Sequence, residues 1–140
     1  MIIKFKKLHQ NAKLPTYATD GSACFDFYAT ESVWLSRGHT FSTGLAAEIP
    51  EGYVLKIYSR SGHGFNKGIR LANCVGIIDQ DYRGEIKIKL VVDGYAHLEV
   101  EQGDRIAQGM LIKVDRPALE WSEEISETDR GEGGFGSTGA

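Results

Sequence analysis

Apolar and polar residues alternate in several short segments of the chain, with the two-residue period of a β-strand. The alternation is clearest at residues 85–90, where Ile86, Ile88 and Leu90 fall on one face and charged residues fall on the other. Further segments that are short, apolar and rich in β-branched or aromatic residues lie at 2–5, 23–29, 41–49, 53–58 and 106–114. Glycine-containing turns separate them. The pattern predicts many short strands and one short helix, at residues 59–66.

Short strands at close spacing, without a long amphipathic helical pattern, are typical of an all-β sandwich, barrel or jelly roll. The 140 residues suit one domain, and the composition changes only from Glu123, where the chain becomes polar and then glycine-rich. We therefore expect a β domain at residues 1–122 and a C-terminal arm at 123–140. Arg130 and Phe135 stand among the glycines, which indicates a flexible arm that orders over a ligand.

Composition and charge exclude several classes of protein. The net charge of −3 argues against a surface that wraps nucleic acid, although it permits a local basic pocket for phosphates. The N-terminus does not resemble a signal peptide, and no stretch has the ~18 apolar residues of a membrane helix. Cys24 and Cys74 are isolated in apolar neighbourhoods. We expect two reduced thiols in or near the core, and a chain that is not secreted but works in the cytoplasm, nucleoplasm or a similarly reducing interior.

Three segments carry groups that can bind phosphate. One is the run at 59–62, Ser-Arg-Ser-Gly, another is the glycine-rich run at 130–139, and the third comprises Arg105 and Gln108 after a turn. Each alone fits an ordinary surface turn, and none is a Walker P-loop, because no Gly-Lys-Ser/Thr follows a strand. Their occurrence together in one short chain favours a phosphate site.

Residues 76–86 combine two apolar residues, an acidic turn, a tyrosine, an arginine and a glycine before the alternating strand. One interpretation is a β-hairpin with a charged tip. The functional interpretation is a carboxylate and a tyrosine ring that rigid flanks hold around a pocket.

Together these segments resemble the homotrimeric dUTPase family, over nearly the whole chain. That family has five short motifs in a fixed order, and similar motifs stand here at residues 18–27, 59–69, 73–86, 103–108 and 130–139. The resemblance implies a jelly-roll-like subunit that hydrolyses dUTP to dUMP and pyrophosphate. This activity limits uracil incorporation into DNA and supplies dUMP for dTTP synthesis.

The resemblance also implies a role for each matching residue. Asp79 would be the general base that activates the water attacking the α-phosphate. Asp81 is chemically as able, and Asp79 is preferred because it matches the family position three residues before the tyrosine. The residues implied to bind uracil and deoxyribose are Asn73, Ile77, Ile78, Tyr82, Lys87 and Phe135.

A second group of residues would hold the triphosphate. Those implied by the motifs are Arg60, Ser61, Gly62, Gln108, Arg130, Gly136, Ser137 and Thr138. Mg²⁺ would be bound mainly by substrate phosphates and water. Asp26 either holds one of these waters or forms a structural ion pair with Arg105 or another arginine.

In the family, each active site draws its motifs from three subunits, so the resemblance implies a homotrimer with shared active sites. This chain departs from the family pattern at Cys24, Ser59, His63-Gly64-Phe65 and Gly109-Met110, which affects the packing around the phosphates. His63 is the one histidine placed to contact a ligand. Two alternatives stay open: a dCTP deaminase, which shares the fold, and a regulatory protein that uses nucleotide as a switch.

Overall fold

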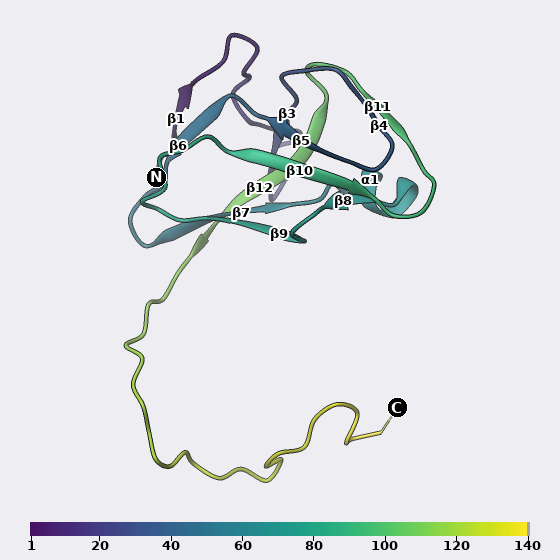
Figure 1. Ribbon diagram of the computed structural model, residues 1–140. Coiled ribbons are helices and arrows are strands. Elements are labelled where there is room, and N and C mark those ends of the chain that lie inside the picture. Colours follow the sequence, from purple (N-terminus) through teal and green to yellow (C-terminus); the bar gives the residue numbers. More distant parts are fainter. Residues whose placement is uncertain (140) are drawn as a thin grey trace.

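The computed structural model describes residues 1–139, so Ala140, the last residue of the predicted arm, lies outside the described part. The β-rich body is drawn in Figure 1, with a long C-terminal segment leading away from it. The main sheet has five antiparallel strands in the order β2-β3-β12-β7-β9. These strands are β2 (Thr16–Tyr17), β3 (Phe25–Tyr28), β12 (Arg105–Lys113), β7 (Tyr53–Tyr58) and β9 (Val75–Ile78).

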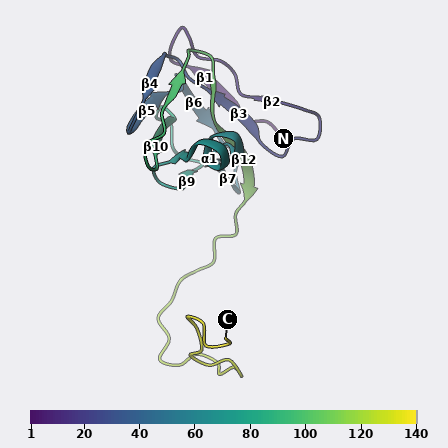
Figure 2. The same cartoon turned by 90° about the vertical axis from the view of Figure 1, so that its right-hand side faces the viewer.

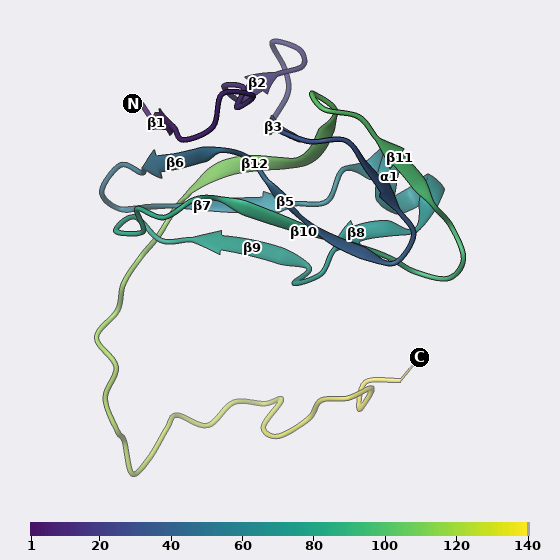
Figure 3. The ribbon, with the colours of Figure 1, turned by 45° about the horizontal axis from the view of Figure 1, so that its top comes forward.

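The other strands form three smaller antiparallel sheets, ordered β5-β10-β8, β1-β6 and β11-β4. In chain order they are β1 (Lys4–Lys7), β4 (Val33–Leu35), β5 (Gly38–Ser42), β6 (Leu45–Glu48), β8 (Ile69–Leu71), β10 (Lys87–Val92) and β11 (Leu98–Val100). The helix α1 (Ser61–Lys67) follows β7. Figure 3 shows β10, β5 and β8 beside the strands of the main sheet.

One hydrophobic core joins the two larger sheets. Phe27 and Leu55 of the main sheet and Phe41 and Leu90 of the three-stranded sheet all belong to it and are almost completely buried. Two antiparallel sheets that share a core in this way form a β-sandwich. The predicted all-β, jelly-roll-like fold is therefore confirmed.

The alternating segment at 85–90 behaves as its pattern predicts. Ile86, Ile88 and Leu90 are at most 1% exposed, whereas Lys87 and Lys89 are exposed. Burial of these apolar side chains thus stabilises the fold, by roughly 25 cal/mol for each Å² of apolar surface removed from water.

The strand boundaries agree with the pattern in places and differ in others. The strand predicted at 53–58 is β7, the segment predicted at 23–29 contains all of β3, and the segment at 106–114 contains all of β12 but its first residue. The segment predicted at 2–5 contains only the first half of β1. The single strand expected at 41–49 is wrong, because the chain turns at 43–44 and moves from β5 in one sheet to β6 in another. The predicted helix is present but covers Ser61–Lys67, and it ends at Gly68, which has a left-handed backbone conformation.

The acidic segment after β9 is not the tip of a β-hairpin. Strand β9 pairs with β7, whereas β10 pairs with β5 and β8. Residues 79–86 therefore carry the chain from one layer of the sandwich to the other. This crossing places the acidic turn at the edge of the main sheet, where its side chains are open to solvent.

Beyond β12 the chain forms no helix or strand as far as residue 139, and Figure 2 shows this segment leading away from the body. Within the described chain, no helix has the length and apolar character needed to cross a membrane. Both cysteines are free thiols: Cys24 is half-buried, but Cys74 is exposed, so the expected place in or near the core is wrong for Cys74.

Gly109, one of the departures from the family pattern, lies where the core leaves no space for a side chain. A Cβ built at this position would lie 2.8 Å from a ring carbon of Phe27, 3.1 Å from one of Phe25 and 3.2 Å from a methyl of Leu55. The glycine therefore accommodates two large rings on the neighbouring strand β3.

We predict that Gly109→Ala destabilises the protein by about 1–3 kcal/mol, because the rings must leave their preferred positions. The midpoint of urea unfolding, compared at one protein concentration, measures the loss. Gly21→Ala is the matched control, since nothing lies within 4 Å of a Cβ at that position. Equal midpoints for the two variants would show that the core around Gly109 is loosely packed.

Candidate functional site

The acidic turn after β9 holds two exposed carboxylates on a fixed backbone. The backbone N–H of Tyr82 donates to the carbonyl oxygen of Asp79 at 3.1 Å. Nη1 of Arg83 donates to the carbonyl oxygens of Gln80 at 2.6 Å and Tyr82 at 3.1 Å. These bonds close the turn through its main chain, and Asp79 and Asp81 remain exposed. A carboxylate held in this way can accept a proton from a bound water.

Tyr82 lies in the same turn, with its ring packed over Gly84. Its hydroxyl donates to the carbonyl oxygen of Glu85 at 3.0 Å, and a Cβ on Gly84 would lie 2.4 Å from the hydroxyl oxygen. Glycine at this position therefore makes room for the ring. Tyr82 is 44% exposed, so part of the residue is open to contact with a ligand.

Strand β9 forms an edge of the main sheet, with Asn73 exposed just before it. In an edge strand, every second pair of backbone N–H and C=O groups points away from the neighbouring strand. Ile77 is 54% exposed and Ile78 is half-buried. This edge offers donors and acceptors to the polar rim of a base. Lys87 begins β10 and lies exposed, with its Nζ 4.0 Å from Oε2 of Glu85.

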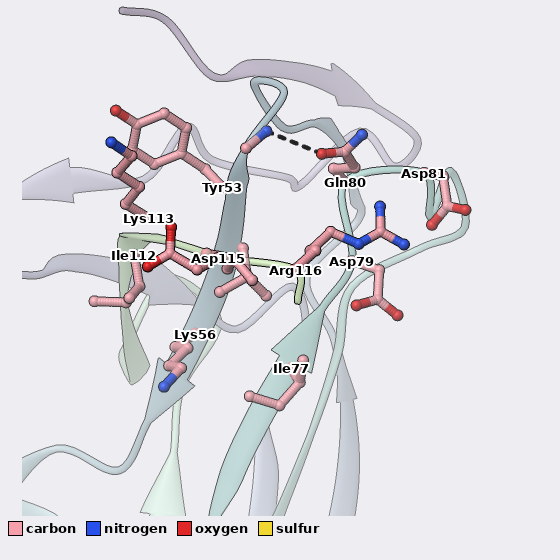
Figure 4. Close-up of a pocket in the computed structure, with 13 residues that line it drawn as sticks. Tyr53, Lys56, Ile77, Asp79, Gln80, Asp81, Ile112, Lys113, Asp115 and Arg116 are labelled. Atoms are coloured by element: carbon pink, nitrogen blue, oxygen red, sulfur yellow. Dashed lines mark hydrogen bonds between the residues drawn. The ribbon is translucent and has the colours of Figure 1, made fainter. Parts of the chain in front are cut away.

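A cavity of about 630 Å³ opens beside the acidic turn, a size typical of small-molecule sites. Figure 4 shows Asp79, Gln80 and Asp81 on one side of it, near Arg116, with Lys56 and Ile77 on the neighbouring strands. Strands β7, β9 and β12 and the segment after β12 supply its walls. The cavity thus combines carboxylates with cationic and apolar side chains.

A second cluster of predicted site residues lies around Asp26, which is 7% exposed. Nε of Arg60 lies 3.5 Å from Oδ1 of Asp26, and Nη1 of Arg105 lies 3.5 Å from Oδ2. Arg60 also donates through Nη1 to the carbonyl oxygen of Arg105 at 3.2 Å. The structural ion pair considered for Asp26 is therefore present, and it involves both arginines. The shared carboxylate holds the two guanidinium groups side by side and restricts the conformations of both side chains.

Gln108 lies on β12 opposite Asp26 and belongs to the same cluster. Its Nε2 donates to the carbonyl oxygen of Ser59 at 3.1 Å, and Oγ of Ser59 accepts from the N–H of Leu71 at 2.9 Å. Ser61 and Gly62 follow at the exposed start of α1, where nothing lies within 4 Å of a Cβ on Gly62. The backbone there is open to an anion.

A single chain does not bring the two clusters together. Ile78 pairs with Leu55 near the start of β7, so Asp79 lies beside the start of this strand, whereas Arg60 follows its other end. Six residues of extended chain separate the two positions, which corresponds to about 20 Å. The acidic turn and the arginine cluster of one chain therefore lie beside opposite ends of β7.

The fifth motif is also apart from both clusters. Arg130 donates through Nε to the carbonyl oxygen of Gly133 at 2.7 Å. The backbone N–H of Ser137 donates to the carbonyl oxygen of Gly134 at 3.0 Å. Phe135 is fully exposed, and Gly136 and Thr138 lie in the same series of turns. In the described part of the chain, no hydrogen bond joins residues 115–139 to the β body. The segment is free to contact another molecule.

Metal-binding groups are not clustered in the described residues: within 1–139, no three His, Cys, Asp or Glu side chains are arranged to hold an ion. The carboxylate of Asp26 has an arginine at each oxygen, which disfavours direct coordination. Scattered carboxylates without a metal-binding cluster fit a hard ion that is held mainly by phosphate oxygens and water, with protein carboxylates acting through water.

His63 lies beside the arginine cluster, in a small cavity of about 230 Å³ that Arg60, Asp104 and Arg105 also line. Its Nδ1 is buried and has no hydrogen-bond partner among the described residues. Burial lowers the pKa of His63 most, and the positive charges of Arg60, Lys67 and Arg105 lower it further, against an opposing effect of Asp104. Burial and the nearby positive charges therefore both favour the neutral form of this side chain.

Two positioning features were not predicted from the sequence. Ser59 was noted as a departure from a common proline, but its hydrogen bonds to Leu71 and Gln108 were not foreseen. The sequence gives no indication of a role for Gln80, whose Oε1 accepts from the N–H of Gly52 at 3.1 Å. No sequence signal connects residues 28 positions apart.

Comparisons with known proteins agree with this geometry. The family model described as dUTPase matches residues 10–139. Among curated relatives, the deoxyuridine 5'-triphosphate nucleotidohydrolase of Nautilia profundicola is 44% identical over 99% of both chains. The protein of the same name from Wolinella succinogenes is 45% identical over 99% of this chain and 95% of its own.

Solved structures give the same result at the level of the fold. A dUTPase of Staphylococcus bacteriophage 80alpha, described with dUpNHpp, superposes with a TM-score of 0.89 at 28% identity, over 99% of both chains. Another structure of that phage enzyme, 29% identical, is described in terms of control of virulence-gene transfer by a G protein-like mechanism. A phage phi11 variant, described with a structural Mg(II) ion, shares the fold with a TM-score of 0.78 at 24% identity.

The fold and the two clusters define a jelly-roll-like β protein of the nucleotide-binding type seen in these structures. With its match over residues 10–139, the chain belongs to the dUTPase family. The family resemblance inferred from the five motifs is thereby confirmed.

We predict that His63 makes the protein less stable in acid. Because the pKa of His63 is lowered in the folded chain, the unfolded chain binds the proton first as the pH falls below the ordinary value of 6.5. The free energy of unfolding should therefore decrease between about pH 7.5 and about pH 5.5, and His63→Leu should lose less over this range. Urea unfolding at both pH values measures the difference.

The control for this prediction is His97→Gln, which changes an exposed histidine that stacks on Trp34 and does not line the cavity of His63. It should keep the acid-induced loss of the unmodified protein. If His63→Leu keeps that loss in full as well, burial of a neutral His63 has no part in the acid sensitivity.

Proposed function

We propose that this member of the dUTPase family hydrolyses dUTP to dUMP and pyrophosphate, with Mg²⁺, in a homotrimer with shared active sites. The observation that carries the proposal is the arrangement around the acidic turn. A carboxylate, the face of a tyrosine ring and an unpaired strand edge lie there together, which suits a water, a deoxyribose and a uracil.

In this mechanism Asp79 takes a proton from a water molecule as the water oxygen attacks the α-phosphorus. The bond from that phosphorus to the bridging oxygen of the β-phosphate breaks, and pyrophosphate leaves with the bond electrons. Mg²⁺, held by phosphate oxygens and water, would neutralise charge on the triphosphate. The protein contributes mainly by positioning the water and clamping the phosphates.

Recognition of the base follows from the edge of β9. Asn73 and the backbone groups at Ile77 and Ile78 bind the polar rim of uracil, and cytosine would leave some of these groups unpaired. Tyr82 packs on the deoxyribose and leaves no space for a 2′-hydroxyl. Lys87 lies at the beginning of the following strand, within the same subsite.

The triphosphate binds Arg60, Ser61, Gly62 and Gln108, which the ion pair with Asp26 and the hydrogen bond to Ser59 hold in place. Asp26 takes part through a water of the metal ion at most, because both of its oxygens face arginines. The arm at 123–140 then closes over the ligand. Its contributing residues are Arg130, Phe135, Gly136, Ser137 and Thr138.

Assembly supplies what a single chain lacks. The separation of Asp79 and Arg60 along β7 within one chain supports a site that combines the acidic turn of one subunit with the arginine cluster of another. Val75 and Ile77 are 37% and 54% exposed on an edge strand, which favours a subunit contact there. Leu119, Trp121 and Ile125 are at least 89% exposed and stand at even spacings, so an extended segment turns them to one side, where a neighbouring subunit can cover them.

In the cell, we propose that the enzyme works in the cytoplasm, nucleoplasm or host-cell interior, where its free thiols stay reduced. It would limit uracil incorporation into DNA and supply dUMP for dTTP synthesis. The match to the dUTPase family model disfavours the alternative of a dCTP deaminase, and ammonia release from dCTP tests that alternative directly.

We predict that the purified protein with Mg²⁺ releases pyrophosphate from dUTP but not from dCTP, dTTP or UTP. Asp79→Asn should lower the turnover number by about 10²-fold or more, because the amide accepts no proton from water. Asp81→Asn is the matched control, since it removes the other exposed carboxylate of the same turn. Loss of activity in Asp81→Asn alone would transfer the role of base to Asp81.

We further predict that deletion of residues 130–140 leaves a folded trimer with a turnover number lower by about 10²-fold, because the arm orders the ligand and adds little to the core. Light scattering and circular dichroism check the assembly and the fold, and pyrophosphate release gives the rate. A truncated protein with full activity would exclude the clamping role of the arm.

A further inference from the structure

Gly52, in the turn between β6 and β7, joins two segments that are distant in the sequence. Its N–H donates to Oε1 of Gln80 at 3.1 Å, and its carbonyl oxygen accepts from the N–H of Val114 at 2.9 Å. Gln80 lies in the acidic turn, and Val114 is the first residue beyond β12. The dashed line in Figure 4 marks the bond from Gly52 to Gln80. One residue of the body therefore anchors both the acidic turn and the start of the segment that leads from β12 to the arm.

The bond to Gln80 differs from the other bonds of the turn. The backbone bond from Tyr82 to Asp79 and the bonds of Arg83 link residues of the turn to one another. They fix the shape of the turn without fixing its place in the molecule. Among the described residues, Gln80 to Gly52 is the one hydrogen bond that ties residues 79–84 to a distant part of the chain.

The orientation of the side chains agrees with this distinction. Gln80 is half-buried and bonded inward, whereas its neighbours Asp79 and Asp81 on either side are exposed. Successive side chains of the turn therefore alternate between an anchor and free carboxylates. An amide also suits the position between two acids, because it offers an acceptor to Gly52 without adding a third negative charge.

We propose that Gln80 is a positioning residue, which fixes Asp79 through its hydrogen bond to Gly52. The proposal rests on the proposed role of Asp79 as the base. Residue 78 is the last to pair with β7, so the backbone ladder ends before the turn begins. Without the anchor, the turn is held only at its two ends, by β9 and by the hydrogen bonds of Glu85 and Ile86 to residues 44 and 45, and Asp79 can shift between them. A displacement of about 1 Å at a catalytic group can cost up to about 10²-fold in rate.

The test uses two substitutions of similar length that differ in the acceptor. Gln80→Met removes the acceptor and should lower the turnover number of dUTP hydrolysis by about tenfold, while the KM changes less than about twofold. Gln80→Glu keeps an acceptor oxygen and should retain turnover, with the acid limb of the pH profile moved to higher pH by the added negative charge. Gln80→Ala serves in place of the Met variant if that variant misfolds.

Hydrogen exchange of the Gly52 amide gives a second readout that is independent of activity. Exchange should become faster in Gln80→Met than in Gln80→Glu, because only the Met variant leaves this N–H without its acceptor. Unchanged turnover in Gln80→Met would overturn the proposal, as would an equal loss in the Met and Glu variants. Asp79→Asn, assayed in parallel, separates the two ideas: full activity in that variant overturns the role of the base itself.

Discussion

The length of β7 is the constraint on which the functional organisation depends. The acidic turn lies beside the first residues of this strand and the arginine cluster follows its last residue, so the two groups of site residues are held apart. A strand is stiff and its rise is fixed, so no local rearrangement shortens the gap. The strand that stabilises the core of each subunit is thus also the spacer between the two clusters, and this separation supports the trimer proposed here.

Electrostatic pairing prepares the phosphate side before any ligand arrives. Asp26 lies nearly buried between Arg60 and Arg105, and a buried carboxylate of this kind is tolerable only because both oxygens face positive groups. The two guanidinium groups would otherwise repel each other. With their net charge of +1, the three side chains still attract an anion, and the neutral His63 nearby adds no further charge. The cluster therefore combines a fixed geometry with a remaining attraction for phosphate.

Much of this arrangement follows from the sequence, and the remainder depends on contacts between distant residues. The alternation of Ile86, Ile88 and Leu90 predicts a strand with one buried face, because local spacing decides which face an apolar side chain occupies. The crossing of the chain between sheets after β9 was not predictable, since a charged turn between two strands looks alike in a hairpin and in a crossover. The hydrogen bond between Gln80 and Gly52 was also not predictable from the sequence, because neither residue type indicates which distant residue it contacts.

The exposed segment that precedes the arm makes the stability of the chain depend on its own concentration. Trp121 and Leu119 are completely or almost completely exposed when no other subunit covers them, so the free energy of burying these side chains becomes available only on association. A newly made copy in a cell that holds few others carries an extended, sticky segment that proteases can cut. In the proposed trimer, the expression level would therefore affect the lifetime of each copy as well as the amount of enzyme.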